Sequence, residues 1–164
     1  MGVWLRRKPW YFECSNYLVN SQSSDATGFV RALEDFSRFL KVITGRTQTL
    51  KAIRKRKQSF FVCLSAPQIQ PLQKDLPEIT AGADAVELRV DLLEDPRSPE
   101  RLPSPEFVVE QLTALRQATP LPVVFTIRTK LQGGKFPDEA YSEARELYQT
   151  GLRLGCEFLS LIHI

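Results

Sequence analysis

The chain has 164 residues, of which 43% are hydrophobic and 25% are charged, a balance typical of folded globular proteins and not of disordered ones. This length allows one complete domain or parts of two, and the sequence contains no run of about 18 apolar residues that would predict a transmembrane helix. The formal net charge of +3 depends on one segment, residues 46–58, which holds six Lys or Arg and no acid.

The first 45 residues predict an apolar opening followed by one helix. Residues 1–24 are dense in aromatic and aliphatic side chains, which is unusual at the start of a domain and suggests the end of a larger unit. No signal peptide is expected, because the charged start is not followed by an apolar segment. Residues 25–45 predict an amphipathic helix that ends at Gly45. Its apolar stripe consists of Phe29, Leu33, Phe36, Leu40 and Ile43.

The basic segment at residues 46–58 has two interpretations. A run of Lys and Arg can contact nucleic acid or serve as a localisation signal. It lacks the interleaved aromatic residues of a single-strand binder, however, and charge runs are usually solvated. We therefore interpret the segment as a basic linker and do not expect nucleic-acid binding.

From residue 59 onward, apolar strands alternate with amphipathic helices. The strands are predicted at residues 60–64, 85–91, 123–128 and 156–164, and the helices at residues 71–82, 104–119 and 137–154. This alternation is typical of parallel βαβ units. Because a (β/α)8 barrel takes about 250 residues, about four strands predict either a small open sheet or close to half a barrel.

The most informative strand is residues 85–91. Alternate residues of a strand face the same side, so Glu87, Arg89 and Asp91 share one face and valine and leucine occupy the other. Strands of parallel sheets are normally apolar on both faces, and buried charges need partners. The pattern favours a polar site over the alternatives, which are a solvated edge strand or an ion pair that only supports packing.

Arg128 is the second candidate site residue. It ends an apolar run at the carboxyl end of a strand, where ligands bind in α/β folds. An arginine there can hold a carboxylate in a two-pronged contact. The following loop contains Gly133 and Gly134, which permit a sharp turn or a close approach of the backbone, although such a pair is also common in plain surface loops.

Other familiar chemistries are poorly supported. The three cysteines, Cys14, Cys63 and Cys156, are widely spaced without a C-x-x-C motif, which indicates reduced thiols in a cytosolic protein. The only histidine, His163, stands at the second-last position, so neither a zinc site nor histidine-assisted nucleophilic catalysis is expected. Lys130 lies in a polar loop with no sign of the desolvation that an imine-forming lysine needs. No metal and no cofactor are predicted.

At three places the stretch from Ser59 to about Phe158 resembles type I 3-dehydroquinate dehydratase. The matching elements are Glu87-Leu-Arg89-Val-Asp91, Phe125-Thr126-Ile127-Arg128 and Gln132-Gly133-Gly134. The segment from Trp4 to Gly45 resembles the carboxyl-terminal end of a shikimate kinase. These two domains are adjacent, in this order, in the pentafunctional AROM polypeptides of fungi.

The resemblance implies a partial (β/α)8 barrel of about four βα units, preceded by the last strand and helix of a P-loop kinase-like domain. The expected divisions are a kinase remnant at residues 1–45, the basic linker at 46–58 and the first half of the dehydratase barrel at 59–164. The family converts 3-dehydroquinate to 3-dehydroshikimate in the cytosol without a metal, through an imine on a lysine and proton transfer by a histidine. The resemblance also implies a homodimeric parent and no membrane association.

Several residues match binding positions of the two families. The substrate-binding positions of the dehydratase correspond to Glu87, Arg89, Arg128, Gln132 and Cys63. Gln132 stands where bacterial relatives often have an acid, and Cys63 stands where a serine is common. Arg7, in the pattern R-x-P-x-Y, matches a shikimate-binding arginine of the kinase.

The departures from the family predict a chain that is inactive alone. The imine lysine and the catalytic histidine of the family lie beyond residue 164, and His163 does not replace the latter. The Ser160-Leu-Ile162 sequence stands where the family usually has Asp-Leu-Glu, so the similarity is expected to break near Leu159. Two rivals remain: a non-enzymatic half-barrel that acts as a binding or scaffolding piece, and a nucleic-acid binder that uses the basic segment.

Overall fold

A four-stranded parallel sheet forms the centre of the protein. The computed structural model describes residues 2–19 and 26–161. The strands are β1 (Phe61–Leu64), β2 (Ala85–Arg89), β3 (Val123–Thr126) and β4 (Phe158–Ser160). Each pairs with the strand before it in sequence, in the order β1-β2-β3-β4. In a (β/α)8 barrel each new strand is added on the same side of the one before it, whereas in a doubly wound sheet the order of the strands reverses at one point. The strand order therefore favours the partial barrel.

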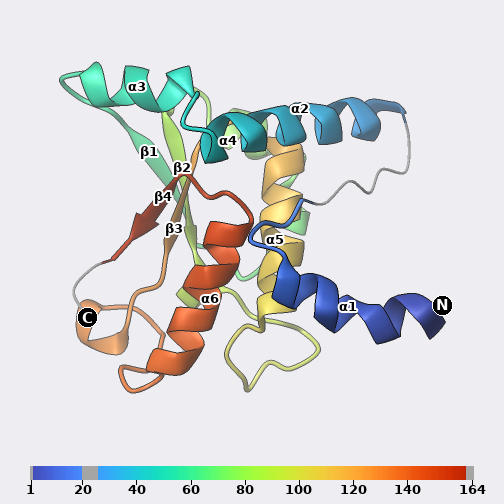
Figure 1. The fold of residues 1–164 in the computed structure, drawn as a ribbon. Coiled ribbons are helices and arrows are strands. Elements are labelled where there is room, and N and C mark those ends of the chain that lie inside the picture. The colour runs from blue at the N-terminus through green and yellow to red at the C-terminus, as the bar shows by residue number, and fades with distance from the viewer. Residues whose placement is uncertain (1, 20–25, 162–164) are drawn as a thin grey trace.

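Two long helices pack on one face of this sheet (Figure 1). Helix α5 (Pro105–Ala118) begins as predicted, with the Ser104 hydroxyl accepting a hydrogen bond from the Phe107 backbone at 3.2 Å. Helix α6 (Tyr141–Arg153) starts later than predicted and is closed by Gly155, which adopts a φ of +66°. The two helices supply the second layer of the βαβ units.

Several predicted elements are shorter than expected, among them the strand predicted at 123–128, which ends at Thr126 and leaves Arg128 in the following loop. The predicted helix at residues 71–82 is only a 3₁₀ turn, η1 (Gln70–Leu72), and one helical turn, α4 (Leu76–Ile79), because Pro71 and Pro77 cannot donate backbone hydrogen bonds. Strand β2 stops at Arg89, where the chain turns into the 3₁₀ turn η2 (Val90–Leu92). The last strand covers only part of the predicted 156–164, and residues 162–164 lie outside the described residues.

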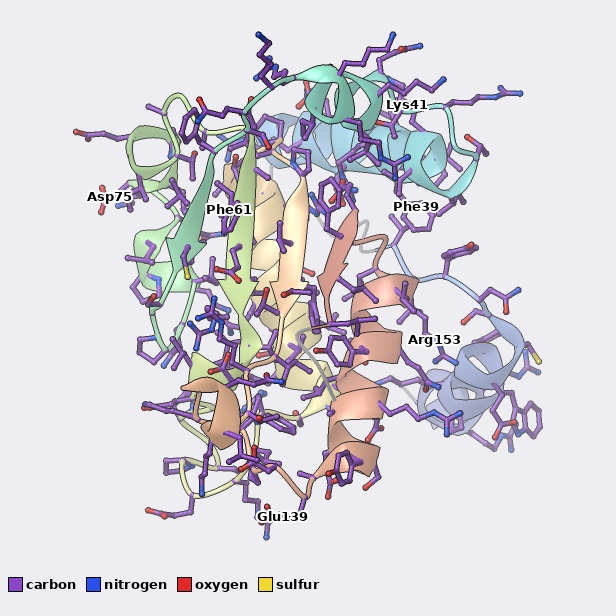
Figure 2. All side chains as sticks on the ribbon, turned by 90° about the vertical axis from the view of Figure 1, so that its left-hand side faces the viewer. Phe39, Lys41, Phe61, Asp75, Glu139 and Arg153 are labelled. Atoms are coloured by element: carbon purple, nitrogen blue, oxygen red, sulfur yellow. The ribbon has the colours of Figure 1, made fainter. Side chains whose placement is uncertain are left out.

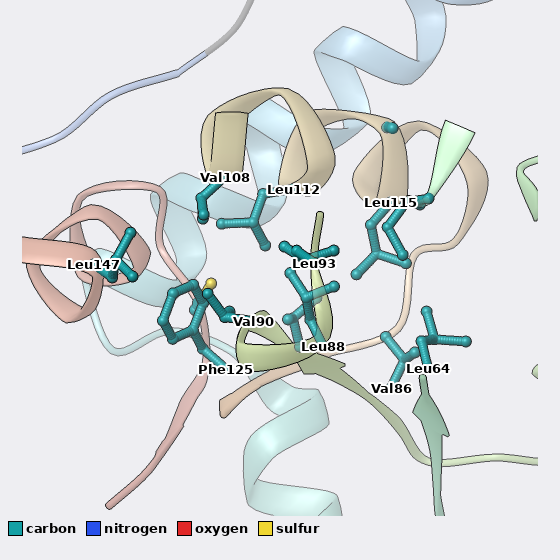
Figure 3. Packing of buried hydrophobic residues seen from close by; sticks show 14 of the residues in the cluster. Leu64, Val86, Leu88, Val90, Leu93, Val108, Leu112, Leu115, Phe125 and Leu147 are labelled. Atoms are coloured by element: carbon teal, nitrogen blue, oxygen red, sulfur yellow. The ribbon is translucent and has the colours of Figure 1, made fainter. Parts of the chain in front are cut away.

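The hydrophobic core lies between the sheet and helices α5 and α6 (Figure 3). Its largest buried side chains include Leu64, Val86, Leu88, Val90, Val108, Leu112, Leu115, Phe125 and Leu147. Gly151 lets α6 approach the sheet closely, because a Cβ at this position would lie 3.0 Å from the Phe125 ring. The apolar residues of β2 thus face the helices, as the alternation predicts, and this leaves its polar residues for the opposite face.

The described residues before position 46 form helices and no strand. Helix α1 (Gly2–Cys14) precedes α2, so the last strand expected for a kinase-like domain is not found among these described residues. A strand at this place would have no neighbouring strand to satisfy its backbone, whereas a helix satisfies its own. The basic segment also differs from a plain linker, because α3 (Gln48–Lys55) is helical, with Leu50 and Ile53 half-buried three residues apart.

The predicted amphipathic helix is confirmed as α2 (Ala26–Ile43), but its apolar stripe faces solvent. Phe29, Leu33, Phe36 and Leu40 are between 41% and 63% exposed. The helix lies near the amino-terminal end of the sheet (Figure 1) and contacts α5 and the turn before β4 through its other face, where Phe39 is buried. Phe39 packs on Gly155 so closely that a Cβ there would come within 2.7 Å of its ring.

A buried ion-pair cluster holds α2 in this place. The Glu157 carboxylate lies between Arg38 of α2 and Arg116 of α5, with both N–O distances at 2.6 Å, and also accepts a hydrogen bond from the Val123 backbone at 2.8 Å. Charges at this depth are tolerated because each is paired.

None of the helices in the described part of the chain is long and apolar enough to span a membrane.

Candidate ligand-binding site at the carboxyl edge of the sheet

The face of the sheet opposite α5 carries polar side chains at the carboxyl ends of the strands. Figure 2 views this face, with the strands in front of α5. On β2, Glu87 and Arg89 point to this side and are only 4% and 8% exposed. Strand β1 adds Cys63, whose Cα pairs with that of Glu87, and β3 adds Thr126, whose Cα pairs with that of Arg89. The register brings these side chains onto one face in two adjacent rows, Cys63 beside Glu87 and Arg89 beside Thr126.

Glu87 is held by its neighbour on β3. The Thr126 hydroxyl, which is fully buried, donates to Glu87 Oε1 at 2.8 Å. On the other side, the Cys63 thiol is near Glu87 and lies 3.7 Å from the Ser65 hydroxyl. Burial, followed by the hydrogen bond to the Glu87 carboxylate, raises the pKa of the Cys63 thiol. This thiol is therefore suited to donating a hydrogen bond and poorly suited to nucleophilic attack.

Arg89 and Asp91 form a two-pronged ion pair. Arg89 Nε and Nη2 donate to the two Asp91 oxygens, each at 2.8 Å. Burial acts to raise the pKa of the Asp91 carboxyl. The hydrogen bonds from the Arg89 guanidinium and from the backbone N–H groups of Lys135 and Arg128 outweigh it, so that the pKa is lowered. The hydrogen bond to Asp91 in turn raises the pKa of Arg89. Both groups are therefore charged at neutral pH.

The loop after β3 places Arg128 beside this pair. The Arg128 carbonyl accepts from the Phe136 backbone at 3.1 Å, and the Asp91 carboxylate accepts from the Lys135 backbone at 3.2 Å. Gly134 is needed for this approach, because a Cβ there would lie 2.1 Å from the Arg128 carbonyl oxygen. Of the two interpretations of the Gly-Gly pair, close backbone approach is confirmed at Gly134.

One donor of Arg128 has no partner. Its Nε is buried, and within the described residues nothing accepts a hydrogen bond from it. A buried donor without an acceptor is costly and therefore uncommon. It marks a position where a ligand oxygen can complete the site.

Two predicted site residues are placed differently. Gln132 lies in the 3₁₀ turn η3 (Lys130–Gln132), where it forms a capping box with Thr129 and accepts from the Thr129 backbone at 3.3 Å. Arg7, which was predicted for the separate kinase remnant and not for this site, is exposed on α1, on the far side of α6 from the strands (Figure 1). The residues that converge are Cys63, Glu87, Arg89 and Arg128.

Sequence reasoning missed Thr126 as a member of the site and placed Asp91 on the polar face without assigning it a role. Thr126 stands two residues before Arg128 in the predicted strand 123–128, so the two-residue alternation could have found it. Asp91 shared the predicted face but could not be assigned a partner without the fold. In the described residues no three His, Cys, Asp or Glu side chains are grouped as a metal site would require.

No lysine among the described residues is fully buried. Lys135 is ion-paired with Glu94 at 2.9 Å in an exposed position. Lys8 on α1 is half-buried. The remaining lysines, Lys41, Lys51, Lys55, Lys57, Lys74 and Lys130, are exposed. A lysine that forms an imine needs desolvation or a cationic neighbour, and burial of this kind is not found among them.

Comparison with known proteins connects this site to a family. Residues 60–161 match the family model described as type I 3-dehydroquinase. The chain is also similar to a solved structure, "Dehydroquinate dehydratase and shikimate dehydrogenase from S. pombe AroM", with 44% sequence identity and a TM-score of 0.64. The similarity covers 67% of this chain and 21% of the S. pombe chain, so this sequence corresponds to about a fifth of that relative.

Proposed function

The chain belongs to the type I 3-dehydroquinase family, and we propose that it binds 3-dehydroquinate at the carboxyl edge of its sheet. The observation that carries this proposal is the group formed by the buried Glu87 and Arg89 and by Arg128, whose buried Nε has no acceptor among the described residues. All three residues lie inside the segment that matches the family model.

The chemistry of the site suits this substrate. 3-Dehydroquinate carries one carboxylate, one ketone and several hydroxyl groups. The guanidinium groups of Arg89 and Arg128 suit the carboxylate and hydroxyl oxygens, because such charge-assisted hydrogen bonds are the strong ones. The Glu87 carboxylate can accept from a substrate hydroxyl while its Oε1 accepts from the Thr126 hydroxyl.

We also propose that these 164 residues bind substrate without turning it over. The family reaction needs a desolvated lysine, and the described lysines are exposed or lie on α1 away from the sheet. Glu87, Arg89 and Arg128 would therefore bind and orient the substrate. The relation of residues 1–45 to a shikimate kinase, a substrate role for Gln132 and Arg7, and a cytosolic location belong to the same proposal and rest on sequence resemblance.

The test is calorimetric titration of the purified 164-residue chain with 3-dehydroquinate. The matched variants are Arg128→Met, which removes the guanidinium from the site, and Arg101→Met, which removes one from an exposed surface loop. Saturable binding that Arg128→Met weakens by at least about tenfold and Arg101→Met leaves unchanged would support the proposal. Equal binding by the two variants, or no binding by the wild-type chain, would reject it.

A non-enzymatic binding or scaffolding role is the second candidate. Strands β1 and β4 are the outer strands of the described sheet, and Phe60 and Phe61 beside the β1 edge are 64% and 58% exposed. Unpaired sheet edges promote association with another strand. A defined dimer mass by light scattering, together with absence of substrate binding, would favour this role over the first.

A further inference from the structure

We propose that Asp91 is a positioning residue that fixes both arginines of the binding site, Arg89 through its guanidinium and Arg128 through its loop. This inference rests on the proposed function and extends it, because Asp91 is not among the groups that would touch the substrate. Its side chain has no exposed surface.

Asp91 first fixes the Arg89 guanidinium through two hydrogen bonds. Asp91 Oδ1 accepts from Arg89 Nε and Asp91 Oδ2 accepts from Arg89 Nη2, each at 2.8 Å. Two parallel hydrogen bonds fix the plane of a guanidinium, whereas a single bond allows it to rotate. The orientation of Arg89 toward the site is thus determined by a group two residues further along its own strand and turn.

Asp91 then fixes the loop that follows β3 through backbone hydrogen bonds. Asp91 Oδ2 also accepts from the Lys135 backbone at 3.2 Å, and the backbone of Arg128 contributes a further hydrogen bond to the same carboxylate. Arg128 and Lys135 are the two ends of a loop that closes on itself through Gly134. Asp91 therefore joins the end of β2 to the loop that positions Arg128.

Only a carboxylate satisfies this set of donors. An asparagine at this position would have almost the same shape, but it offers one acceptor oxygen, and its NH2 group would face an N–H donor of Arg89. The buried donor would then lack an acceptor. Asp91→Asn consequently separates the electrostatic role of the group from its volume.

The test compares wild type, Asp91→Asn and the surface variant Arg101→Met, each as the 164-residue chain. Two quantities are measured: the affinity for 3-dehydroquinate, and the hydrogen-exchange rates of the Arg89 side-chain Nε–H and the Lys135 backbone N–H by NMR. We expect Asp91→Asn to weaken binding by about tenfold or more and to speed exchange at both groups by a similar factor, with Arg101→Met unchanged. Unchanged affinity, or unchanged protection of either group in Asp91→Asn, would overturn the inference.

The exchange measurements keep this inference separate from the proposed function. If wild type does not bind 3-dehydroquinate, the proposed function fails, while the two N–H groups still show whether Asp91 holds both of its partners. If Asp91→Asn does not fold, the inference is tested instead by following the NMR signals of the wild-type chain during an acid titration. The Arg89 and Lys135 signals must then shift with one common midpoint, and independent midpoints would contradict a shared carboxylate.

Discussion

The Thr126 hydroxyl donates to Glu87 across strands β2 and β3 at 2.8 Å, and both residues are buried. Replacing Thr126 with valine keeps the shape of the side chain but leaves a buried carboxylate oxygen without its donor. We expect Thr126→Val to reduce the free energy of unfolding by about 1–3 kcal/mol. Thr126→Ser retains the hydroxyl and should cost less, about 1 kcal/mol for the lost methyl group. Urea unfolding measures both, and a serine variant as unstable as the valine variant would show that the hydroxyl is not the cause.

Gly134 provides a second prediction, about the loop that carries Arg128. A Cβ at Gly134 would lie 2.1 Å from the Arg128 carbonyl oxygen, which is backbone and cannot move aside cheaply. Gly133, with a φ of +74°, has open space around it. We expect Gly133→Ala to cost about 1 kcal/mol of strain and Gly134→Ala to cost more. Only Gly134→Ala should also expose the Phe136 backbone N–H to rapid exchange. Equal effects of the two substitutions on stability and exchange would contradict the close approach.

The Glu157 cluster predicts acid sensitivity at the opposite end of the sheet. Burial acts to raise the pKa of Glu157, but Arg116 and Arg38 outweigh it and lower the pKa below its usual value. A carboxyl whose pKa is lowered on folding contributes stability above its unfolded pKa and loses that contribution as pH falls through its folded pKa. The docking of α2 should therefore weaken below about pH 4.5. Fluorescence of a probe attached at Cys14 would follow the release of the amino-terminal helices.

The matched variant for this cluster is Glu157→Gln. It removes the charge between Arg38 and Arg116 but leaves the shape, and breaking a buried ion pair from one side costs about 3–5 kcal/mol. The variant should be less stable at neutral pH and should lose the acid transition that Glu157 contributes below about pH 4.5. An acid transition of unchanged size in Glu157→Gln would assign that transition to other carboxyl groups.

The three cysteines should differ in reactivity. Cys14 and Cys63 are exposed, whereas Cys156 is buried and burial raises its pKa to about 12. Alkylation of the native chain followed by peptide mass mapping should therefore label Cys14 readily, label Cys63 more slowly because its pKa is raised, and spare Cys156. Because Cys63 adjoins Glu87 in the binding site, 3-dehydroquinate should slow its labelling but not that of Cys14. Equal protection of both thiols by the ligand would point to a general change in the protein.

The sequence predicts the strands better than it predicts their partners. The two-residue alternation in β2 identifies Glu87 and Arg89 as one polar face, because that pattern is local. The Thr126–Glu87 hydrogen bond depends on the register of β3 against β2, which pairs Arg89 with Thr126 and follows from packing that a local pattern does not contain. For the same reason, the partner of Asp91 and the missing partner of Arg128 could not be predicted.

Contacts between segments that are distant in the sequence could not be predicted either. The stripe on α2 correctly predicts a helix, but an apolar stripe normally predicts the buried face, and here Phe39 and Arg38 on the other side make the contact. The strand expected for a kinase-like domain is not found among the described residues before α2, where the sequence is apolar without a strict period. Such a segment takes the conformation that satisfies its backbone in its surroundings.

The most direct test of the proposed site is to locate 3-dehydroquinate on the chain by NMR. Backbone and arginine side-chain signals of the 164-residue chain are followed during titration with the ligand. The structure predicts that the largest saturable shifts occur at Glu87, Arg89, the Arg128 Nε–H and the loop through Gly134, and that helices α1 and α2 are unaffected. Saturable shifts confined to α1 and α2, or no saturable shifts anywhere, would contradict a substrate site at the carboxyl edge of the sheet.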